Sequence, residues 1–243
     1  MKSTAGMRQR ALPRLAGGCP WVKTDVVTPE TVGFQTGAPM LHIRDLRTSI
    51  LEPASLALSA GECIAVKGPS GAGKTLLLRA IADLDPNQGS VTLDGRDRST
   101  IPGPEWRRLV GYVPAEPGWW AETVGVHFRD WAAACACLKE LGFSEETKSW
   151  PVSRMSTGER LRFALVRALM VGPRVLLLDE PTAALDAGAV AAVEALIASR
   201  IRGGLAVLWV THDEPQGGRI ACRLTPGVFS ASTLRAVRSW SEV

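Results

Sequence analysis

The order of apolar and polar positions predicts an α/β protein whose patterned part begins at Met40. Apolar and polar residues alternate at 41–43 and 56–58, as in antiparallel strands, whereas 63–66 and 175–178 are continuous apolar runs typical of buried strands. Later strands alternate with helices, which predicts a mostly parallel sheet covered by helices. The predicted strands are 41–43, 56–58, 63–66, 90–93, 109–113, 175–178 and 205–210, and the predicted helices are 74–82, 121–141, 159–171 and 189–201.

The first 39 residues lack any such pattern. They are rich in Gly, Pro, Thr and Arg, and we predict a disordered N-terminal extension over 1–39, followed by one domain over 40–243. Residues 1–39 hold five Lys or Arg and two acidic residues, a net +3 of the chain's +4, so 40–243 carry only +1. This charge balance gives no basic face for nucleic acid.

Composition limits the setting in which the chain works. The 243 residues are 46% hydrophobic, enough for a large core, yet no stretch approaches the roughly 20 apolar residues that span a bilayer. The five cysteines lack metal-type spacing, and Cys135 and Cys137 are expected to be small core residues. We therefore expect a cytoplasmic protein whose membrane work, if any, needs a separate membrane subunit.

One segment matches the phosphate-binding loop pattern G-x-x-x-x-G-K-[ST], between a predicted strand and a predicted helix. Its glycines let successive backbone N–H groups point at phosphate oxygens, and the helix adds its positive end. Lys74 is expected to neutralise the β- and γ-phosphates, and the Thr75 hydroxyl to ligate Mg²⁺. The predicted ATP-binding residues here are Gly68, Pro69, Ser70, Gly71, Ala72, Gly73, Lys74, Thr75 and Leu76.

Two carboxylates, Asp179 and Glu180, follow the apolar run 175–178. The carboxyl end of a buried strand is where α/β sheets place their ligands. Asp179 is suited to hold Mg²⁺ through water, and Glu180 to polarise the attacking water as a general base. A surface acidic pair after a core strand is the alternative, and the phosphate loop argues against it.

Two further segments indicate a function only through their order in the chain. Ser156-Thr157-Gly158-Glu159 by itself is an ordinary helix start, with Ser156 as cap and Glu159 three residues later. His212, which follows the strand 205–210, by itself would be structural. The acidic strand and the segment Pro181-Thr182-Ala183-Ala184-Leu185-Asp186 stand between them in a fixed order.

In that order, from about Met40 to Ile220, the chain resembles the nucleotide-binding subunits of ABC transporters. The resemblance rests on four ordered motifs, GPSGAGKT, MSTGER, LLLDEPTAALD and THD. It implies an ABC-type P-loop NTPase fold with a mostly parallel central sheet, an antiparallel β part and a short helical subdomain at about 116–170. The catalytic residues that it implies are Glu180, His212 and Lys74, with His212 contacting the γ-phosphate.

The resemblance also implies a shared site. Two subunits, a homodimer or a pair of cassettes, would sandwich two ATP molecules head to tail. Each ATP would contact the phosphate loop of one subunit and Ser156, Thr157, Gly158 and Glu159 of the other, with Asp186 reaching across the interface. The implied function is an ATPase that drives a separate integral membrane permease from the cytoplasmic face of the cell membrane. The alternative is a soluble ABC-type ATPase with an assembly or regulatory role.

Three positions depart from the family pattern. Ala115 occupies the slot of a Gln that ligates Mg²⁺ and links nucleotide to the helical subdomain, although Glu116 is a possible substitute. Thr157 replaces a usual Gly, and a β-branched residue is penalised if the backbone there needs a positive φ. The stretch 48–51 has no aromatic residue to stack on adenine.

Four tryptophans lie in or beside the predicted helical subdomain. We expect Trp131 and Trp150 to be core residues, whereas the adjacent Trp119 and Trp120 cannot both point inward on an extended segment. One of that pair should be exposed. Because Trp is enriched at interface hot spots, Trp119 or Trp120 is a candidate for the docking surface of the permease.

Overall fold

The computed structural model describes residues 40–67, 70–211 and 222–223, so the predicted extension 1–39 lies outside the described residues. The strands are β1 (Leu41–Arg47), β2 (Ala54–Leu58), β3 (Cys63–Lys67), β4 (Gln88–Leu93), β5 (Arg96–Asp97), β6 (Val110–Val113), β7 (Val175–Asp179), β8 (Ala206–Thr211) and β9 (Cys222–Arg223). The helices are α1 (Lys74–Ile81), α2 (Gly103–Leu109), α3 (Trp131–Glu140), α4 (Thr157–Leu169) and α5 (Ala187–Arg202), with short 3₁₀ turns η1 (Arg98–Thr100), η2 (Val124–His127), η3 (Glu145–Ser149) and η4 (Val152–Arg154).

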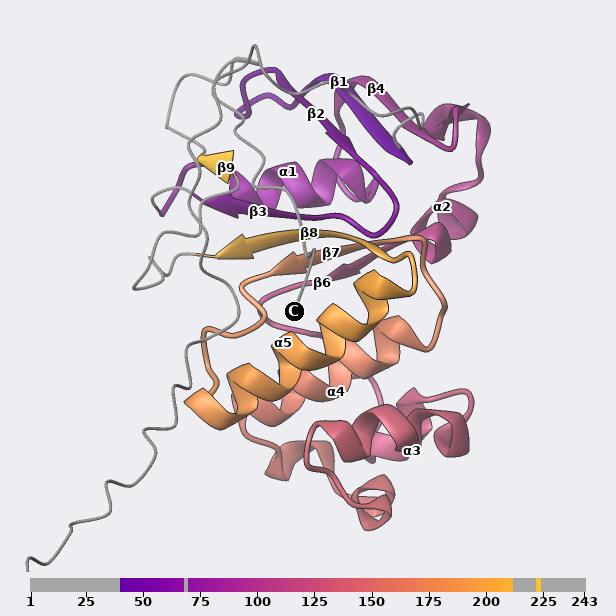
Figure 1. Cartoon of the computed structure of the whole chain (residues 1–243), viewed down its shortest axis with the longest axis vertical. Helices are drawn as coiled ribbons and strands as arrows, with labels where there is room; N and C mark the ends of the chain where they lie inside the picture. Colours follow the sequence, from indigo (N-terminus) through magenta and orange to yellow (C-terminus); the bar gives the residue numbers. More distant parts are fainter. Residues whose placement is uncertain (1–39, 68–69, 212–221, 224–243) are drawn as a thin grey trace, which may run out of the picture.

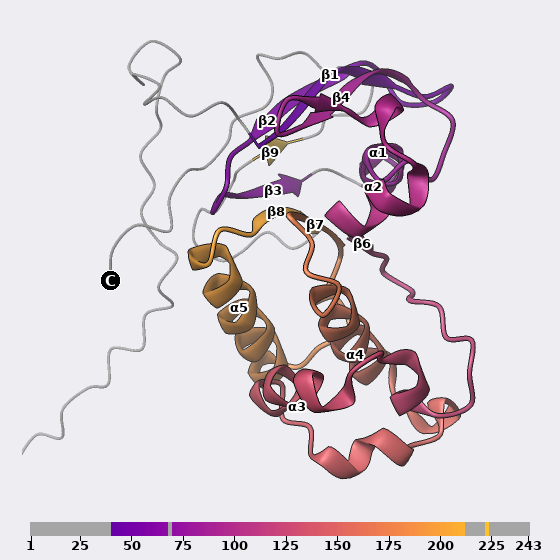
Figure 2. The same ribbon diagram turned by 90° about the vertical axis from the view of Figure 1, so that its right-hand side faces the viewer.

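Two sheets and the helices form layers. The five strands β6-β7-β8-β3-β9 pair only in parallel, and β2-β1-β4-β5 form a separate antiparallel sheet. Figures 1 and 2 show α1 between the two sheets, α4 and α5 on the other face of the parallel sheet, and α3 beyond them. The predicted α/β class, with a parallel sheet and an antiparallel part, is confirmed.

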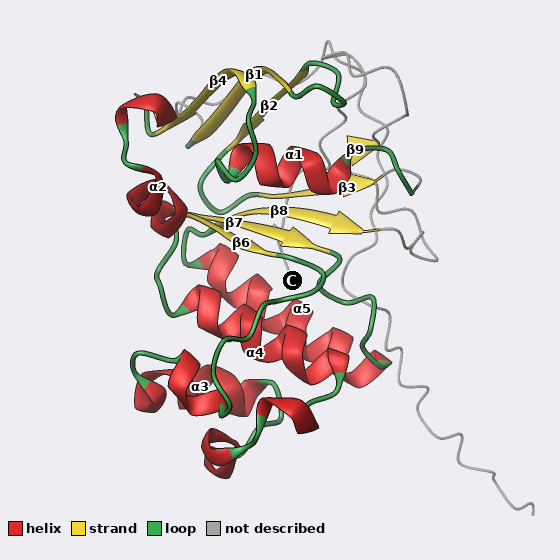
Figure 3. Cartoon of the chain, turned by 180° about the vertical axis from the view of Figure 1, so that it is seen from behind, coloured by secondary structure: helices red, strands yellow, loops and turns green. Residues whose placement is uncertain are grey.

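Apolar side chains fill both faces of the parallel sheet. One core joins the antiparallel sheet, α1 and one face of β3, β7 and β8, and a second joins the opposite face to α3, α4 and α5. Every residue of β7 is buried, as its continuous apolar run predicts. The three strands that end nearest the phosphate loop are therefore held rigidly from both sides, and their arrowheads point the same way in Figure 3.

The prediction of one helix over 121–141 is wrong. Residues 124–127 form the turn η2, and α3 begins only at Trp131, where the Asp130 carboxylate accepts a hydrogen bond from the Ala133 N–H at 2.9 Å. The backbone before it is used elsewhere, because the Val124 N–H donates to Trp150 O at 3.0 Å. Contacts with a distant segment, which periodicity does not reveal, prevent helix formation there.

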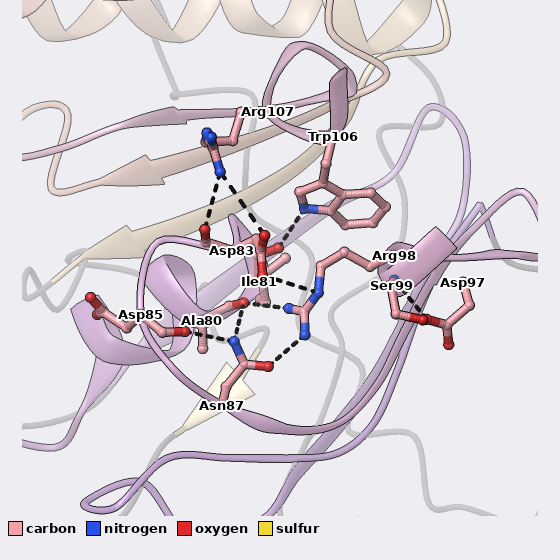
Figure 4. Close-up of polar contacts among 10 residues, drawn as sticks. All are labelled: Ala80, Ile81, Asp83, Asp85, Asn87, Asp97, Arg98, Ser99, Trp106 and Arg107. Atoms are coloured by element: carbon pink, nitrogen blue, oxygen red, sulfur yellow. Dashed lines mark hydrogen bonds and ion pairs between the residues drawn. The ribbon is translucent and has the colours of Figure 1, made fainter. Parts of the chain in front are cut away.

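The C-terminal end of α1 is fixed by side chains from two other elements (Figure 4). The Arg98 guanidinium donates to Ala80 O at 2.7 Å, and the buried Trp106 indole donates to Ile81 O at 2.9 Å. These carbonyls lie in the last turn of α1, where the regular hydrogen bonds of the helix run out and other donors are needed. Since Lys74 and Thr75 begin the same helix, η1 and α2 help to hold the phosphate-binding end in place.

Candidate nucleotide and metal site

The phosphate loop lies where three parallel strands end together. β8 pairs with both β3 and β7, and the last register pairs are Lys67 with Thr211 and Asp179 with Val210. The loop leaves β3 and enters α1. Gly71 and Gly73 have φ of 78° and 85°, a left-handed conformation that a side chain would strain. Gly68 and Pro69 lie outside the described residues.

Two loop residues reach the acidic strand. The Thr75 hydroxyl donates to Asp179 Oδ2 at 2.9 Å, and both Lys74 and Asp179 are buried, at 5% and 2% exposure. Burial lowers the pKa of Lys74, and the charges of Glu180 and Asp179 oppose that shift. One ammonium group beside two carboxylates leaves the site one negative charge in excess, which suits a divalent cation.

Tyr112, which was not among the predicted site residues, belongs to the same site. Its hydroxyl donates to Asp179 Oδ2 at 3.1 Å, from β6, the strand next to β7. Burial, and then the charge of Asp179, raises the pKa of Tyr112 well above its usual range, so the phenol stays a donor. A polar residue among apolar ones, on a strand just before Ala115, was the signal that could have found it.

Asp179 has an oxygen left over. Its Oδ1 is buried and has no hydrogen-bond partner within the described part of the chain, whereas Oδ2 accepts from Thr75 and Tyr112. A buried carboxylate oxygen without a partner is costly. Beside a threonine hydroxyl, it is also the type of ligand that Mg²⁺ prefers. The residues present therefore fit a magnesium ion.

Glu180 has a left-handed backbone, with φ of 50°. Its N–H donates to Val210 O at 3.0 Å, and its carbonyl accepts from the Ala183 N–H at 3.3 Å. A non-glycine residue in this region costs on the order of 1–3 kcal/mol, and such residues cluster at functional sites. The geometry turns the chain sharply at the end of β7, directly after the metal-type ligand Asp179.

The segment 156–159 caps α4. Ser156 Oγ accepts the Glu159 N–H at 3.2 Å, and Glu159 Oε2 accepts the Ser156 N–H at 2.8 Å, a complete capping box. Thr157, the first residue of α4, is not among the described residues with positive φ. The strain considered for Thr157 is therefore absent.

The same segment is joined to the chain that follows Glu180. A Cβ placed on Gly158 would lie 2.9 Å from Ala184 O, so the backbones are already in contact. Two residues later, Asp186 caps α5 by accepting the Ala189 N–H at 2.9 Å. This hydrogen bond is the main cause that lowers the pKa of Asp186.

The predicted residues therefore form two groups. Lys74, Thr75 and Asp179 are in direct or electrostatic contact, with Glu180 beside them, whereas Gly158 lies against Ala184 and Leu185. α4 runs into β7 and α5 follows it, so both helices begin on the side where the strands end. Ser70, Ala72 and Leu76 lie in the described part of the loop and α1, and His212, which follows β8, lies outside the described residues.

The stretch before the loop offers apolar contact and no aromatic ring. The Thr48 hydroxyl accepts the N–H groups of Ile50 and Leu51, at 3.2 and 3.0 Å. Leu51 is buried and lies 3.1 Å from the Cβ position of Gly73, whereas Ile50 is 79% exposed. The turn thus presents one aliphatic side chain to solvent near the phosphate loop.

Beyond β6, two tryptophans enclose a histidine and an arginine. His127 Nε2 accepts the N–H groups of Trp120 and Ala121, at 3.0 and 3.1 Å, and the Arg167 guanidinium lies 4.7 and 4.8 Å from the ring centres of Trp119 and Trp120. Trp120 is 71% exposed and Trp119 is half-buried. The prediction that one of the pair is exposed is confirmed.

The other side chains singled out for the core are mostly buried. Trp131 is buried, whereas Trp150 is half-buried under the Arg154 guanidinium, which lies 3.7 Å from its ring centre. Cys137 is buried and Cys135 half-buried, and no cluster of three or more His, Cys, Asp or Glu side chains suited to a metal ion forms among the described residues. None of the described helices has the length and apolar character to cross a bilayer.

Comparison with known proteins gives a consistent result. A family model described as ABC transporter matches residues 51–183. The chain is 42% identical over 173 residues, 68% of its length, to the aliphatic sulfonates import ATP-binding protein SsuB 2 of Agrobacterium fabrum (strain C58), of which the match spans 65%. It is 32% identical over 200 residues to the probable iron export ATP-binding protein FetA of Escherichia coli (strain K12), covering 75% of this chain and 89% of FetA.

A solved structure agrees. The dimeric, post-hydrolysis ATP-binding cassette MJ0796, bound to ADP and Pi, has a TM-score of 0.65 and 25% sequence identity, over 77% of this chain and 95% of that one.

Proposed function

This chain belongs to the ABC transporter family, as one of its ATP-binding subunits. On that premise, we propose that two such subunits pair head to tail, bind and hydrolyse ATP between them, and so drive a separate membrane permease. The observation that carries the proposal is the contact between the helix that follows the phosphate loop and the end of β7. Thr75, on the phosphate-loop helix, donates to Asp179 at the end of the acidic strand, beside Lys74 and Glu180. This contact supports phosphate binding and metal binding at one sheet edge.

Each residue has a distinct role. The loop N–H groups and Lys74 hold the phosphates, and Thr75 and Asp179 hold Mg²⁺, which when bound neutralises charge on the β- and γ-phosphates. Glu180 orients water and accepts its proton. Ser156, Thr157, Gly158 and Glu159 at the start of α4 contact the γ-phosphate on the other subunit, since a helix N-terminus favours an anion. His212 contacts the same phosphate, and Asp186 the opposite subunit.

The change Glu180→Gln tests the catalytic role. It keeps the size and the backbone of the residue and removes only the base, so the variant should bind ATP with Mg²⁺, form a dimer and lose turnover by at least about 100-fold. Dimer formation is measured by light scattering, and turnover by phosphate release. The matched control is Glu105→Gln, on the exposed side of α2, which should hydrolyse normally. Turnover at the parent rate in Glu180→Gln would refute the base assignment.

The exposed Trp120, with Val126 at 67% exposure, is proposed as the docking surface for an apolar helix of the permease. The surface is pre-formed, because His127 and Arg167 hold the indole in place, and a rigid aromatic side chain loses little entropy on binding. Ala at both Trp119 and Trp120 should abolish permease association and leave basal ATPase activity unchanged. Leu84→Ala, which removes another exposed apolar side chain, is the control. Unchanged association in the double variant would exclude this surface.

The alternative function is a soluble ABC-type ATPase that assembles or regulates a partner without transport. Ala115 favours it, because a methyl group cannot couple nucleotide to a membrane subunit as Gln does. Under ATP-trapping conditions, Glu180→Gln should co-purify from membranes with a multi-helix protein if the subunit serves transport. Recovery with soluble partners alone would favour the alternative.

A further inference from the structure

We propose that Tyr112 is a positioning residue of the metal site, whose hydroxyl fixes the Asp179 carboxylate and connects it to β6. The inference rests on the proposed binding of ATP with Mg²⁺. It concerns only this chain's own residues.

The geometry around Asp179 assigns different tasks to its two oxygens. Oδ2 accepts from Thr75 at 2.9 Å and from Tyr112 at 3.1 Å, and Oδ1 is buried with no partner in the described part of the chain. The Thr75 oxygen could ligate a metal ion through a lone pair while its O–H still donates to Oδ2. Tyr112 supplies a second donor to Oδ2 from a different strand, and two donors fix the plane of the carboxylate so that Oδ1 would be free to serve the ion.

Among the described residues, the charge of Arg79 acts on Tyr112 and that of Lys74 acts on Asp179, and each cation has another task. Arg79 is close enough to influence the pKa of Tyr112, but its guanidinium is engaged by Asp85 through two hydrogen bonds of 2.7 Å. Lys74 is needed at the phosphates. The phenol is neutral, so it orients the carboxylate without cancelling the negative charge that attracts the metal.

The position of Tyr112 on β6 explains why the contact matters beyond orientation. Tyr112 pairs with Leu177, two residues before Asp179, and β6 ends at Val113, directly before the segment that contains Ala115. Further along that segment lies the exposed Trp120. A rigid strand with a hydrogen bond to the metal ligand therefore joins the site to the start of the segment that leads to the tryptophans.

Packing alone offers a simpler explanation for this side chain. Tyr112 is half-buried and packs against the core beside α1, as any aromatic residue could. The two explanations separate in Tyr112→Phe, which keeps the ring and its packing and removes only the hydroxyl.

The experiment measures metal binding without turnover, in the Glu180→Gln background. Mn²⁺ is titrated into the ATP-bound protein and followed by electron paramagnetic resonance, and ATP affinity in EDTA is measured in parallel. Tyr112→Phe should weaken Mn²⁺ binding about 10-fold, as outer-shell partners of metal ligands do, with ATP affinity in EDTA and the melting temperature unchanged. Thr75→Ala, which removes a ligand, is the positive control.

The outcomes are distinguishable. Equal Mn²⁺ affinity in Tyr112→Phe and its parent would overturn the inference. It would also be overturned if the loss of Mn²⁺ affinity came with a matching fall in melting temperature and in ATP affinity without metal, because the hydroxyl would then only stabilise the fold. A parent that binds no metal with ATP would instead refute the proposed function.

Discussion

Substitution of Gly158 by Ala tests how the start of α4 is joined to the catalytic strand. The new Cβ would lie 2.9 Å from both Ala184 O and Leu185 Cδ2, which is 0.5 Å short of ordinary contact at 3.4 Å. The leucine methyl group can rotate away, but the Ala184 carbonyl belongs to the backbone. That backbone lies in a tight turn, since the Ala183 N–H donates to Glu180 O and the Leu185 N–H to Thr182 O.

The magnitude follows from two opposing effects. Overpacking a close contact costs about 1–3 kcal/mol, and replacing Gly by Ala within a helix returns about 0.5–1 kcal/mol. The free energy of unfolding should thus fall by about 0–2.5 kcal/mol, which lowers the melting temperature by no more than about 10 °C at this chain length. The protein stays folded, so a functional loss reports on geometry.

We expect a selective functional effect. A shift of about 0.5 Å at Ala184, four residues after Glu180 and two before Asp186, should reduce ATP-dependent dimer formation and turnover at least about 10-fold, because catalytic geometry tolerates little displacement. ATP binding to the single subunit should not change. Both are measured in the Glu180→Gln background by light scattering and calorimetry, with turnover in the wild-type background.

Gly118→Ala is the matched control for that experiment. A Cβ there has no atom within 4 Å, and its φ is not positive, so the variant should behave as wild type. If Gly158→Ala formed dimers at the same ATP concentration as its parent, the contact between 158 and 184 would have no mechanical role, and the reasoning would be refuted.

Two further predictions concern stability. Trp106→Phe removes the donor to Ile81 O inside the core, which should cost about 1–3 kcal/mol and lower the melting temperature by at least about 2 °C; an unchanged melting temperature would contradict that role for the indole. Hydrogen bonds from the Ser99 hydroxyl and N–H lower the pKa of Asp97 in the folded protein. These bonds stabilise the fold at pH values above the pKa of Asp in the unfolded chain, about 3.9. The stability that they contribute is lost as the pH falls through the lower pKa of the folded protein. In Asp97→Asn, the free energy of unfolding, measured with denaturant, should depend less on pH between about pH 5 and 2. An unaltered pH dependence would contradict the assignment.

Most of the fold followed from local pattern. Continuous apolar runs predicted β3 and β7, and helix starts placed α1, α4 and α5 within about two residues, because burial on one or both faces leaves a period in the sequence. The error at 121–130 arose where the backbone of Val124 bonds to Trp150, a pairing between segments that no local pattern encodes.

By itself, the sequence determined which residues could carry chemistry. The phosphate loop, the carboxylates after 175–178 and the cap at Ser156 are each defined by neighbours within a few positions, so a short pattern identifies them. Only the tertiary structure decided how they meet. It placed Thr75 2.9 Å from Asp179, brought Gly158 against Ala184, and added Tyr112 from a neighbouring strand. These contacts join residues that are far apart in the chain, and strand order and side-chain packing, rather than local spacing, set their distances.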